Sequence, residues 1–403
     1  MKLNRIVPLC LLAMLPFRTV AIAQETREEA QKQQREEKQQ TVTPYEPNLL
    51  ERALKGVETG GIPLITRDGI YAKLGSITTG SGFAYGAGYR SRRLFGSDAA
   101  LDVWGGASLK GYWAGEARVR FPNLGGGRFL AEGYGRRSEY PQEDYFGLGP
   151  DSLRSAQADF QQRAQTFGAR AAMRVAPVVS IGGGLEYYEP RVSDGTDKAL
   201  VSIGEQYDEA SAPGLSAQPN YLRSIAFVEI DSRRPLNARK GGWYRAELSH
   251  YDDRDLSAYS FTRLDVDLRQ YVSFLSERRV LMGRVAASTS DTASGQQMPF
   301  YLMPTLGGND SLRGYRDYRF RGPHALLLQA EYRFEIWSGL DAAFFYDTGK
   351  VAMRRADLDL DDLESDYGVG FRFNTDNGIV LRVDAAFGSR DGNHLWIVFG
   401  GKF

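Results

Sequence analysis

The chain has 403 residues, with 50 basic and 50 acidic side chains, so its formal net charge is zero. This balance argues against a nucleic-acid partner, because proteins that bind nucleic acids carry an excess of basic side chains. Hydrophobic residues make up 42% of the chain, and 22 tyrosines, 21 phenylalanines and 45 glycines are present. The aromatic girdles and tight turns of a transmembrane β-barrel explain this composition better than a soluble β-sandwich does.

The first residues have the features of a secretory signal. A basic start precedes a mostly apolar stretch (residues 6–17), and a small-x-small cleavage site, Ala21-Ile22-Ala23, follows it. The apolar stretch is too short for a membrane-spanning helix, which takes about 20 residues. The only cysteine, Cys10, lies inside this segment. We therefore predict a signal peptide over residues 1–23 and an exported mature chain without disulfides.

Residues 24–67 precede the first predicted strand. Residues 24–40 are dense in charged and amide side chains and have no apolar face to bury, which predicts a solvated periplasmic tail. Residues 48–57 repeat apolar side chains at helical spacing, which predicts a short helix. This helix lies either at the periplasmic mouth of a barrel or simply on the surface. The arrangement places the N-terminus in the periplasm.

From about residue 70 onward, apolar and polar side chains alternate with period two, and helical periodicity disappears. The clearest strands are residues 261–274 and 379–387. A barrel with a lipid face and a charged, wet lumen produces this alternation along a whole chain that has no helices to complete a core. In these two strands we predict that Leu264, Val266, Leu381 and Val383 face lipid, and that Arg263, Asp265, Arg382 and Asp384 face the lumen.

The alternation predicts sixteen strands, an even number as in bacterial single-chain barrels. They lie near 71–77, 83–92, 99–109, 113–121, 127–137, 163–174, 178–189, 221–230, 242–251, 261–273, 278–288, 324–336, 340–347, 366–374, 378–388 and 394–403. The odd-numbered connections include four long stretches, 138–162, 190–220, 289–323 and 348–365, whereas the even-numbered ones are mostly short turns. The predicted fold is therefore an all-β, sixteen-stranded antiparallel transmembrane barrel of the outer membrane over residues 68–403.

Two motifs stand in the last quarter of the chain. Leu312-Arg313-Gly314-Tyr315 lies in the sixth outward loop, and Phe345-Tyr346-Asp347-Thr348-Gly349 ends a strand two elements later. The chain ends on Phe403, at the end of an alternating strand. With residues 231–242 and 368–384, these motifs resemble the BamA/TamA superfamily, whose barrel is also called the bacterial surface antigen domain. The likeness is best over residues 221–403.

The resemblance implies that the sixth loop folds back into the lumen, where its arginine meets acidic side chains of the wall. The matching residues are Arg313, Gly314, Tyr315, Glu331, Asp347 and Gly349, and Phe403 matches the family's C-terminal strand signal. A guanidinium group is permanently charged and binds carboxylates in a forked geometry, so this pairing is chemically sensible. The alternative is that Arg313 is a solvated loop arginine.

No catalytic, metal or cofactor site is predicted. His250 lies near Asp252 and Asp253, as in proteases at barrel rims, but closeness in sequence is weak evidence for catalysis. The acidic run over residues 357–366 lacks the glycine of a calcium-binding loop, which favours a solvated outer loop.

The resemblance implies a function in outer-membrane protein or lipid insertion or translocation. Relatives that handle proteins carry periplasmic POTRA domains, and residues 24–67 are too few for one, so the resemblance covers the barrel alone. The alternative is a structural or porin-like barrel that passes small solutes. The expected partners are outer-membrane lipid and lipopolysaccharide, and a periplasmic or outer-membrane assembly partner; we do not expect an enzyme.

Overall fold

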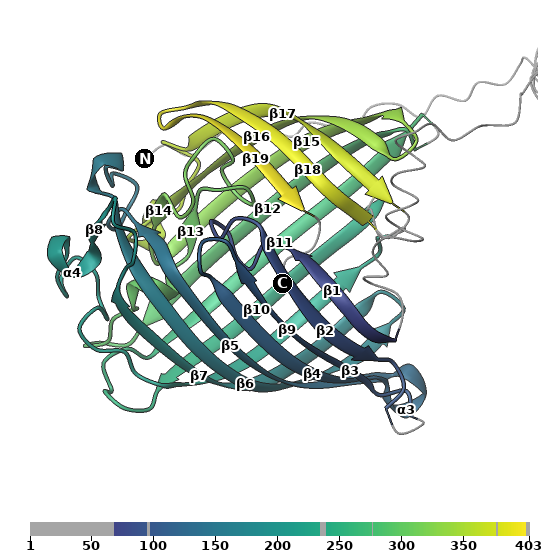
Figure 1. The fold of residues 1–403 in the computed structure, drawn as a ribbon, viewed down its shortest axis with the longest axis horizontal. Helices are drawn as coiled ribbons and strands as arrows, with labels where there is room; N and C mark the ends of the chain where they lie inside the picture. Colours follow the sequence, from purple (N-terminus) through teal and green to yellow (C-terminus); the bar gives the residue numbers. More distant parts are fainter. Residues whose placement is uncertain (1–67, 95–96, 234–238, 276, 376–377, 400–403) are drawn as a thin grey trace, which may run out of the picture. The chain divides into compact units, whose positions relative to one another are not determined.

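The computed structural model describes residues 68–94, 97–233, 239–275, 277–375 and 378–399 (Figure 1). The predicted signal peptide, the periplasmic tail with its short helix, and Phe403 lie outside the described residues. Within the described ranges, no helix is both long and apolar enough to cross a membrane.

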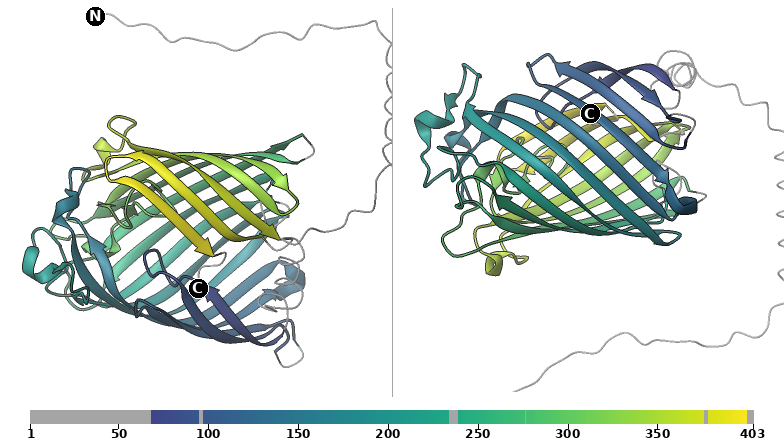
Figure 2. Two further views of the ribbon diagram at one scale, coloured as in Figure 1. Left: turned by 45° about the horizontal axis from the view of Figure 1, so that its top comes forward. Right: turned by 90° about the horizontal axis from the view of Figure 1, so that it is seen from below.

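Sixteen long strands form the wall of a barrel, and each runs antiparallel to the next along the chain (Figures 1 and 2). The prediction of a sixteen-stranded antiparallel barrel is therefore confirmed. The strands are β1 (Gly69–Gly75), β2 (Ala84–Ser91), β3 (Ala100–Ser108), β4 (Trp113–Asn123), β5 (Phe129–Tyr145), β6 (Ala158–Ala176), β7 (Val179–Asp194), β9 (Tyr221–Asp231), β10 (Gly241–Asp253), β11 (Phe261–Phe274), β12 (Arg279–Thr292), β15 (His324–Trp337), β16 (Leu340–Ala352), β17 (Glu364–Thr375), β18 (Gly378–Ser389) and β19 (Gly392–Phe399).

The remaining elements are short and belong to the connections. They are β8 (Val201–Ser202), β13 (Thr305–Leu306), β14 (Phe320–Arg321), the helices α3 (Leu124–Gly127) and α4 (Ile203–Gln206), and the 3-10 turns η2 (Arg154–Ala156), η3 (Phe300–Leu302) and η4 (Arg355–Asp357). β13 and β14 pair with each other inside the sixth outward loop, which we call loop six (residues 293–323).

Two stretches predicted as outer loops are strand instead. Residues 138–145 and 158–162 extend the β5–β6 hairpin, and a bulge between Tyr140 and Glu143 keeps the two strands paired. β16 likewise continues past Gly349 to Ala352. In the β5–β6 extension the bulge shifts the phase of β5, so the alternation of the membrane part is interrupted there.

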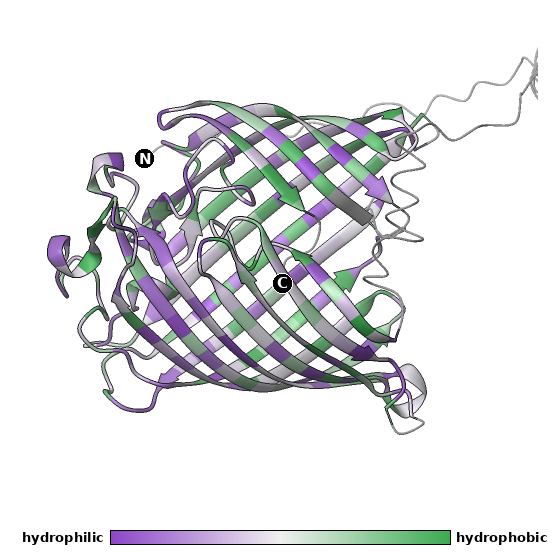
Figure 3. Cartoon of the chain, viewed as in Figure 1, coloured by the Kyte–Doolittle hydropathy of each residue, from purple (hydrophilic) through white to green (hydrophobic). Residues whose placement is uncertain are grey.

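The two faces of the wall differ as alternation requires, and hydrophobic and hydrophilic residues succeed one another along the strands (Figure 3). On β11, Leu264 and Leu268 are 39% and 38% exposed on the outward face. On the inward face, Asp265 accepts a hydrogen bond from Ser288, and Asp267 pairs with Arg284 at 2.8 Å. The lumen is therefore lined by charged side chains, and the outside of the wall is apolar.

The joint between the first and last strands differs from the others. Among the described residues, β1 and β19 share no backbone ladder, whereas every other pair of consecutive long strands does. The two strands nevertheless touch. The rings of Phe83 and Phe399 meet edge to face with centroids 5.3 Å apart, so an aromatic contact links the first hairpin to the last strand. We call this joint the seam.

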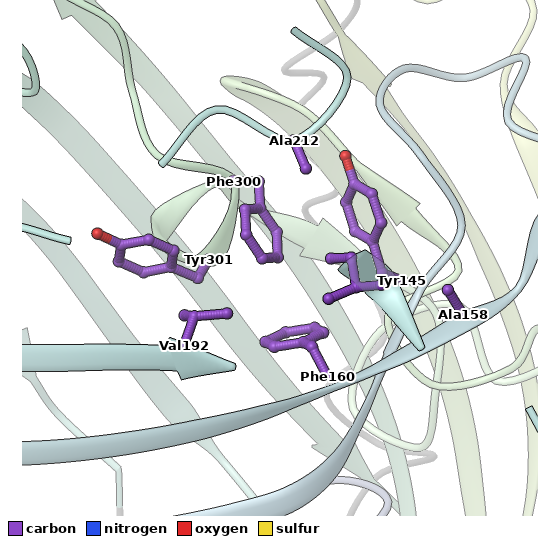
Figure 4. Close-up of a cluster of buried hydrophobic side chains, with 8 residues drawn as sticks. Tyr145, Ala158, Phe160, Val192, Ala212, Phe300 and Tyr301 are labelled. Atoms are coloured by element: carbon purple, nitrogen blue, oxygen red, sulfur yellow. The ribbon is translucent and has the colours of Figure 1, made fainter. Parts of the chain in front are cut away.

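The outer loops share a buried aromatic cluster. Its side chains come from the outer ends of β5, β6 and β7, from α4, from the segment before β9 and from η3 of loop six (Figure 4). Phe300 and Tyr145 have ring centroids 4.9 Å apart, and Phe300 and Phe160 are 5.1 Å apart. This packing anchors the base of loop six and directs the rest of the loop toward the lumen.

Candidate functional site

The tip of loop six is held against the wall by an apolar cluster. Leu312 and Tyr315 are buried on either side of the Arg313-Gly314 pair and pack with residues of β13–β16, namely Leu306, Phe320, Ala325, Leu327 and Val351. The Tyr315 hydroxyl donates a 2.5 Å hydrogen bond to Glu364 at the start of β17. The apolar flanks therefore position the polar residues between them.

Arg313 lies in a dry pocket of carboxylates. Its Nε and Nη2 donate to the two oxygens of Asp347 over 2.7 and 2.8 Å, and its Nη1 donates to Glu331 over 2.9 Å. Arg313 and Glu331 are each 3% exposed, and Asp347 is fully buried. The Phe345 ring lies flat under the guanidinium, 3.4 Å from Cζ. Arg313 is thus not a solvated loop arginine, and the structure brings together the three charged residues that the sequence singled out.

Further charges on the wall complete this cluster. Arg333 and Arg372 donate to Glu331 over 2.5 and 2.6 Å, and Arg382 lies 3.1 Å from Asp384, which also pairs with Arg372. Such a network shields each charge from the cost of burial only while all partners stay in place. We did not predict from the sequence that Arg333, Arg372 and the Arg382–Asp384 pair belong to this site. They share the strand positions that face the lumen, and this alternation could have indicated them.

Gly314 allows the tip of loop six to lie close to strands β17 and β18. A Cβ at this position would overlap the side chain of Asp366 on β17 and crowd Ser389 on β18. Asp366 lies directly across from Asp347 in the β16–β17 ladder and is 1% exposed. Neither oxygen of Asp366 has a hydrogen-bond partner within the described residues. Gly349 acts differently, because a Cβ there would overlap the Leu326 carbonyl of β15, so this glycine allows close pairing of the strands.

Loop six also touches both sides of the seam. On the last strands, the Trp396 indole donates to the Arg313 carbonyl over 2.6 Å, and the Ser389 hydroxyl donates to the Gly314 carbonyl. On the first hairpin, the Tyr318 hydroxyl donates to the Thr79 carbonyl over 3.1 Å. Segments from the two ends of the wall are therefore tied to one loop.

Asp317 lies beside the contact with the first hairpin. One of its carboxylate oxygens has no hydrogen-bond partner among the described residues. Burial and, to a smaller extent, the nearby charge of Asp144 raise the pKa of this carboxyl to about 7, although the charge of Lys110 opposes the rise. The contact therefore contains an acid that titrates near neutral pH.

The adjoining part of the lumen is more open. A cavity of about 530 Å³ lies between loop six and strands β10–β12, and alternating charges line it. Arg245, Glu247 and Arg263 have side chains that are 21%, 13% and 18% exposed, well above the values at Arg313. Loop six thus packs against β15–β18 and leaves a charged cavity beside the adjoining strands β10–β12.

The other candidates of the sequence occupy structural positions. His250 is exposed and pairs with Thr262, while the Asp253 carboxylate accepts four backbone N–H groups of the following loop. In the acidic loop, Asp359 binds Lys350 and Asp357 binds Arg354. Within the described residues, no group of three or more His, Cys, Asp or Glu side chains is arranged to hold a metal ion.

The fold and the inward loop define a barrel of the outer-membrane type. Residues 238–394 match the Omp85 superfamily domain, and this match confirms the resemblance to the BamA/TamA superfamily. Among solved structures, BamA from Haemophilus ducreyi lacking POTRA domains 1-3 is similar, with 13% identity and a TM-score of 0.61 over 83% of this chain and 70% of that one. CdiB from Escherichia coli shares 14% identity and a TM-score of 0.56 over 83% of this chain and 62% of its own. No curated protein sequence matches the chain. At such identities the structural likeness concerns the fold.

Proposed function

We propose that this barrel assists the insertion or translocation of proteins or lipids at the outer membrane. The observation that carries the proposal is the seam, where β1 and β19 lie together without a backbone ladder in the described part of the chain. Opening any other joint breaks a ladder of backbone hydrogen bonds, and buried backbone groups are costly to leave unpaired in a membrane. The seam is therefore the joint of the wall that separates at least cost.

Loop six is the element that keeps this joint closed in our proposal. It binds Trp396 of β19 on one side and Thr79 of the first hairpin on the other. Its own position is fixed by the Arg313 cluster on β15–β18. Separating a buried ion pair leaves both charges unpaired, and removing one partner costs about 3–5 kcal/mol, so release of the loop is costly while the Arg313 cluster is intact. Withdrawal of Arg313 would free both edges together.

The proposal includes the placement of the protein. It is integral to the outer membrane, with the N-terminus and the short turns in the periplasm and the long loops outside. The asymmetry between the long and short connections supports this orientation, since outer-membrane barrels have short periplasmic turns. An assembly partner in the periplasm or the outer membrane would deliver the client.

A porin-like barrel is the second candidate. The charged cavity of about 530 Å³ beside β10–β12 favours it, because small solutes would pass along this wet wall. The dry ion cluster and the loops over the outer mouth oppose a wide, steadily open pore.

One pair of assays separates the two candidates. Liposomes with and without the purified protein receive an unfolded client barrel, and the folding rate is followed by heat-modifiable gel migration. The same liposomes are tested for osmotic swelling in small sugars. Our proposal predicts faster client folding with little swelling, whereas swelling without any effect on client folding contradicts it and supports the porin-like barrel.

A further inference from the structure

Three arginines form a cluster on the outside of the wall. The inward face of β7 is marked by Glu186, which pairs with Arg223, and Arg223 in turn pairs with Glu247 of the luminal cavity. Residues at odd positions of β7 therefore face outward, and the same argument applies to its neighbours β5 and β6. The outward side chains at the outer ends of these strands include Arg137, Arg163 and Arg191.

The cluster stands directly above the apolar band of the barrel. Along β6, the outward residues from Met173 to Phe167 are all apolar, and Gln165 and Arg163 follow. Phe167 and its neighbour across the ladder, Tyr187, are 58% and 41% exposed. The apolar band of such barrels is about 25 Å tall and bordered by aromatic side chains. The arginines thus lie at the level of lipid headgroups in the outer leaflet.

The three charges are held close together and are bound only partly by neutral groups: Arg163 donates to Gln161 over 2.6 Å, and Arg191 donates to Asn220 over 2.9 Å. Arg163 and Arg191 stand directly opposite each other in the β6–β7 ladder, and like charges in this position destabilise a sheet. Their side chains are 58% and 44% exposed. Within the described residues, no carboxylate pairs with Arg137, whose guanidinium lies 5.9 Å from the Trp113 ring.

The nearby carboxylates only partly offset the arginines. Glu139 lies 3.7 Å from Arg163, but its oxygens already accept hydrogen bonds from Trp113 and Gln161. Glu189 pairs with Arg191 at 2.9 Å. Three arginines against two glutamates leave the cluster with one net positive charge.

We propose that this cluster, Arg137, Arg163 and Arg191, binds the phosphate groups of a phosphorylated glycolipid of the lipid A type in the outer leaflet. Guanidinium groups bind phosphate oxygens in a two-point geometry, and a phosphate bound beside these arginines offsets their net positive charge.

Native mass spectrometry of the purified, folded full-length protein tests the inference, which rests on the proposed outer-membrane location. The probes are diphosphoryl lipid A, lipid A without phosphates, and inorganic phosphate. The test variant is Arg163→Gln/Arg191→Gln. The control, Arg254→Gln/Arg354→Gln, removes the same charge from two outer-loop arginines that are 55% and 79% exposed. Because each substitution removes charge-assisted hydrogen bonds to phosphate, the test variant should bind diphosphoryl lipid A at least about tenfold more weakly.

The control should bind within about twofold of the wild type, a change too small to count as a lost contact. Equal binding by the test variant overturns the inference, as does equal binding of phosphate-free lipid A. Inorganic phosphate binding as tightly as the lipid would mean an adventitious ion only. If the double variant does not fold, Arg137→Gln replaces it, because this exposed side chain contacts one ring. Client folding is measured on the same variants, so that the failure of the lipid-binding proposal can be distinguished from the failure of the proposed function. Loss of lipid binding with normal client folding leaves the proposed function intact.

Discussion

The guanidinium of Arg313 and the carboxylate of Asp347 form a two-point contact, with 2.7 Å between Nε and Oδ2 and 2.8 Å between Nη2 and Oδ1. One residue is at the tip of an outer loop and the other is on the barrel wall, so this contact fixes the loop inside the lumen. Asp347 also accepts a 3.0 Å hydrogen bond from Gln329, which holds the carboxylate in place for the fork.

Removing either partner of this contact should have the same consequence. We expect Arg313→Ala and Asp347→Ala each to lower the free energy of unfolding by about 3–5 kcal/mol, since each leaves a buried charge unpaired. The double variant should cost much less than the sum, because both changes remove one shared interaction. Denaturant unfolding followed by tryptophan fluorescence measures these values, and full additivity would show that the residues are not coupled.

Gly314→Ala tests how tightly the loop tip is packed. The added Cβ meets Asp366 and Ser389, so the tip should withdraw and the unfolding temperature should fall. Gly283→Ala is the matched control, because a Cβ at Gly283 has open space around it. Both variants are compared by the temperature at which heat-modifiable migration is lost. A Gly314→Ala protein as stable as the control would mean that the tip is not packed in this way.

The phase of the strands predicts opposite tolerance at neighbouring positions. Val266→Arg places a charge against lipid and should cost about 2–4 kcal/mol near the middle of the bilayer. Asp265→Asn should cost much less, because Asp265 faces the wet lumen, where its side chain is 38% exposed. The free energy of unfolding of each variant is measured in liposomes. An equal loss of stability at both positions would show that the assignment of the two faces is wrong.

Asp317 should make the docking of loop six depend on pH. Its folded pKa of about 7 exceeds the unfolded value of about 3.9, so the folded state binds the proton more tightly. Stability from this group is complete below about pH 4 and is lost as the pH rises toward about 7 and beyond. The unfolding temperature should therefore be higher at pH 5.5 than at pH 8, and Asp317→Asn should reduce the difference. An unchanged difference in that variant would assign the pH dependence to other groups.

The sequence alone predicts the wall well, because period-two alternation reports directly on a surface that faces lipid on one side and water on the other. Arg313, Glu331 and Asp347 were predicted through the resemblance to the BamA/TamA superfamily. Asp384 was predicted only to face the lumen, and Arg372 was not singled out, because strand alternation does not show which charges meet across a ladder or under a loop. The link from Tyr318 to Thr79 joins residues far apart in the chain and depends on the path of loop six, which follows from packing in the folded barrel. The outer extensions of β5 and β6 were missed because a bulge interrupts the alternation.

We propose that loop six holds the seam closed, and the distance between β1 and β19 is the most direct test of this proposal. Spin labels at Ala72→Cys on β1 and Leu395→Cys on β19, in a Cys10→Ser background, report that distance by pulsed electron paramagnetic resonance in liposomes. With Arg313 in place, we expect one short distance with a narrow distribution. In an Arg313→Ala protein that still shows heat-modifiable migration, we expect a longer distance with a broader distribution. The same narrow distribution in both proteins would contradict the claim.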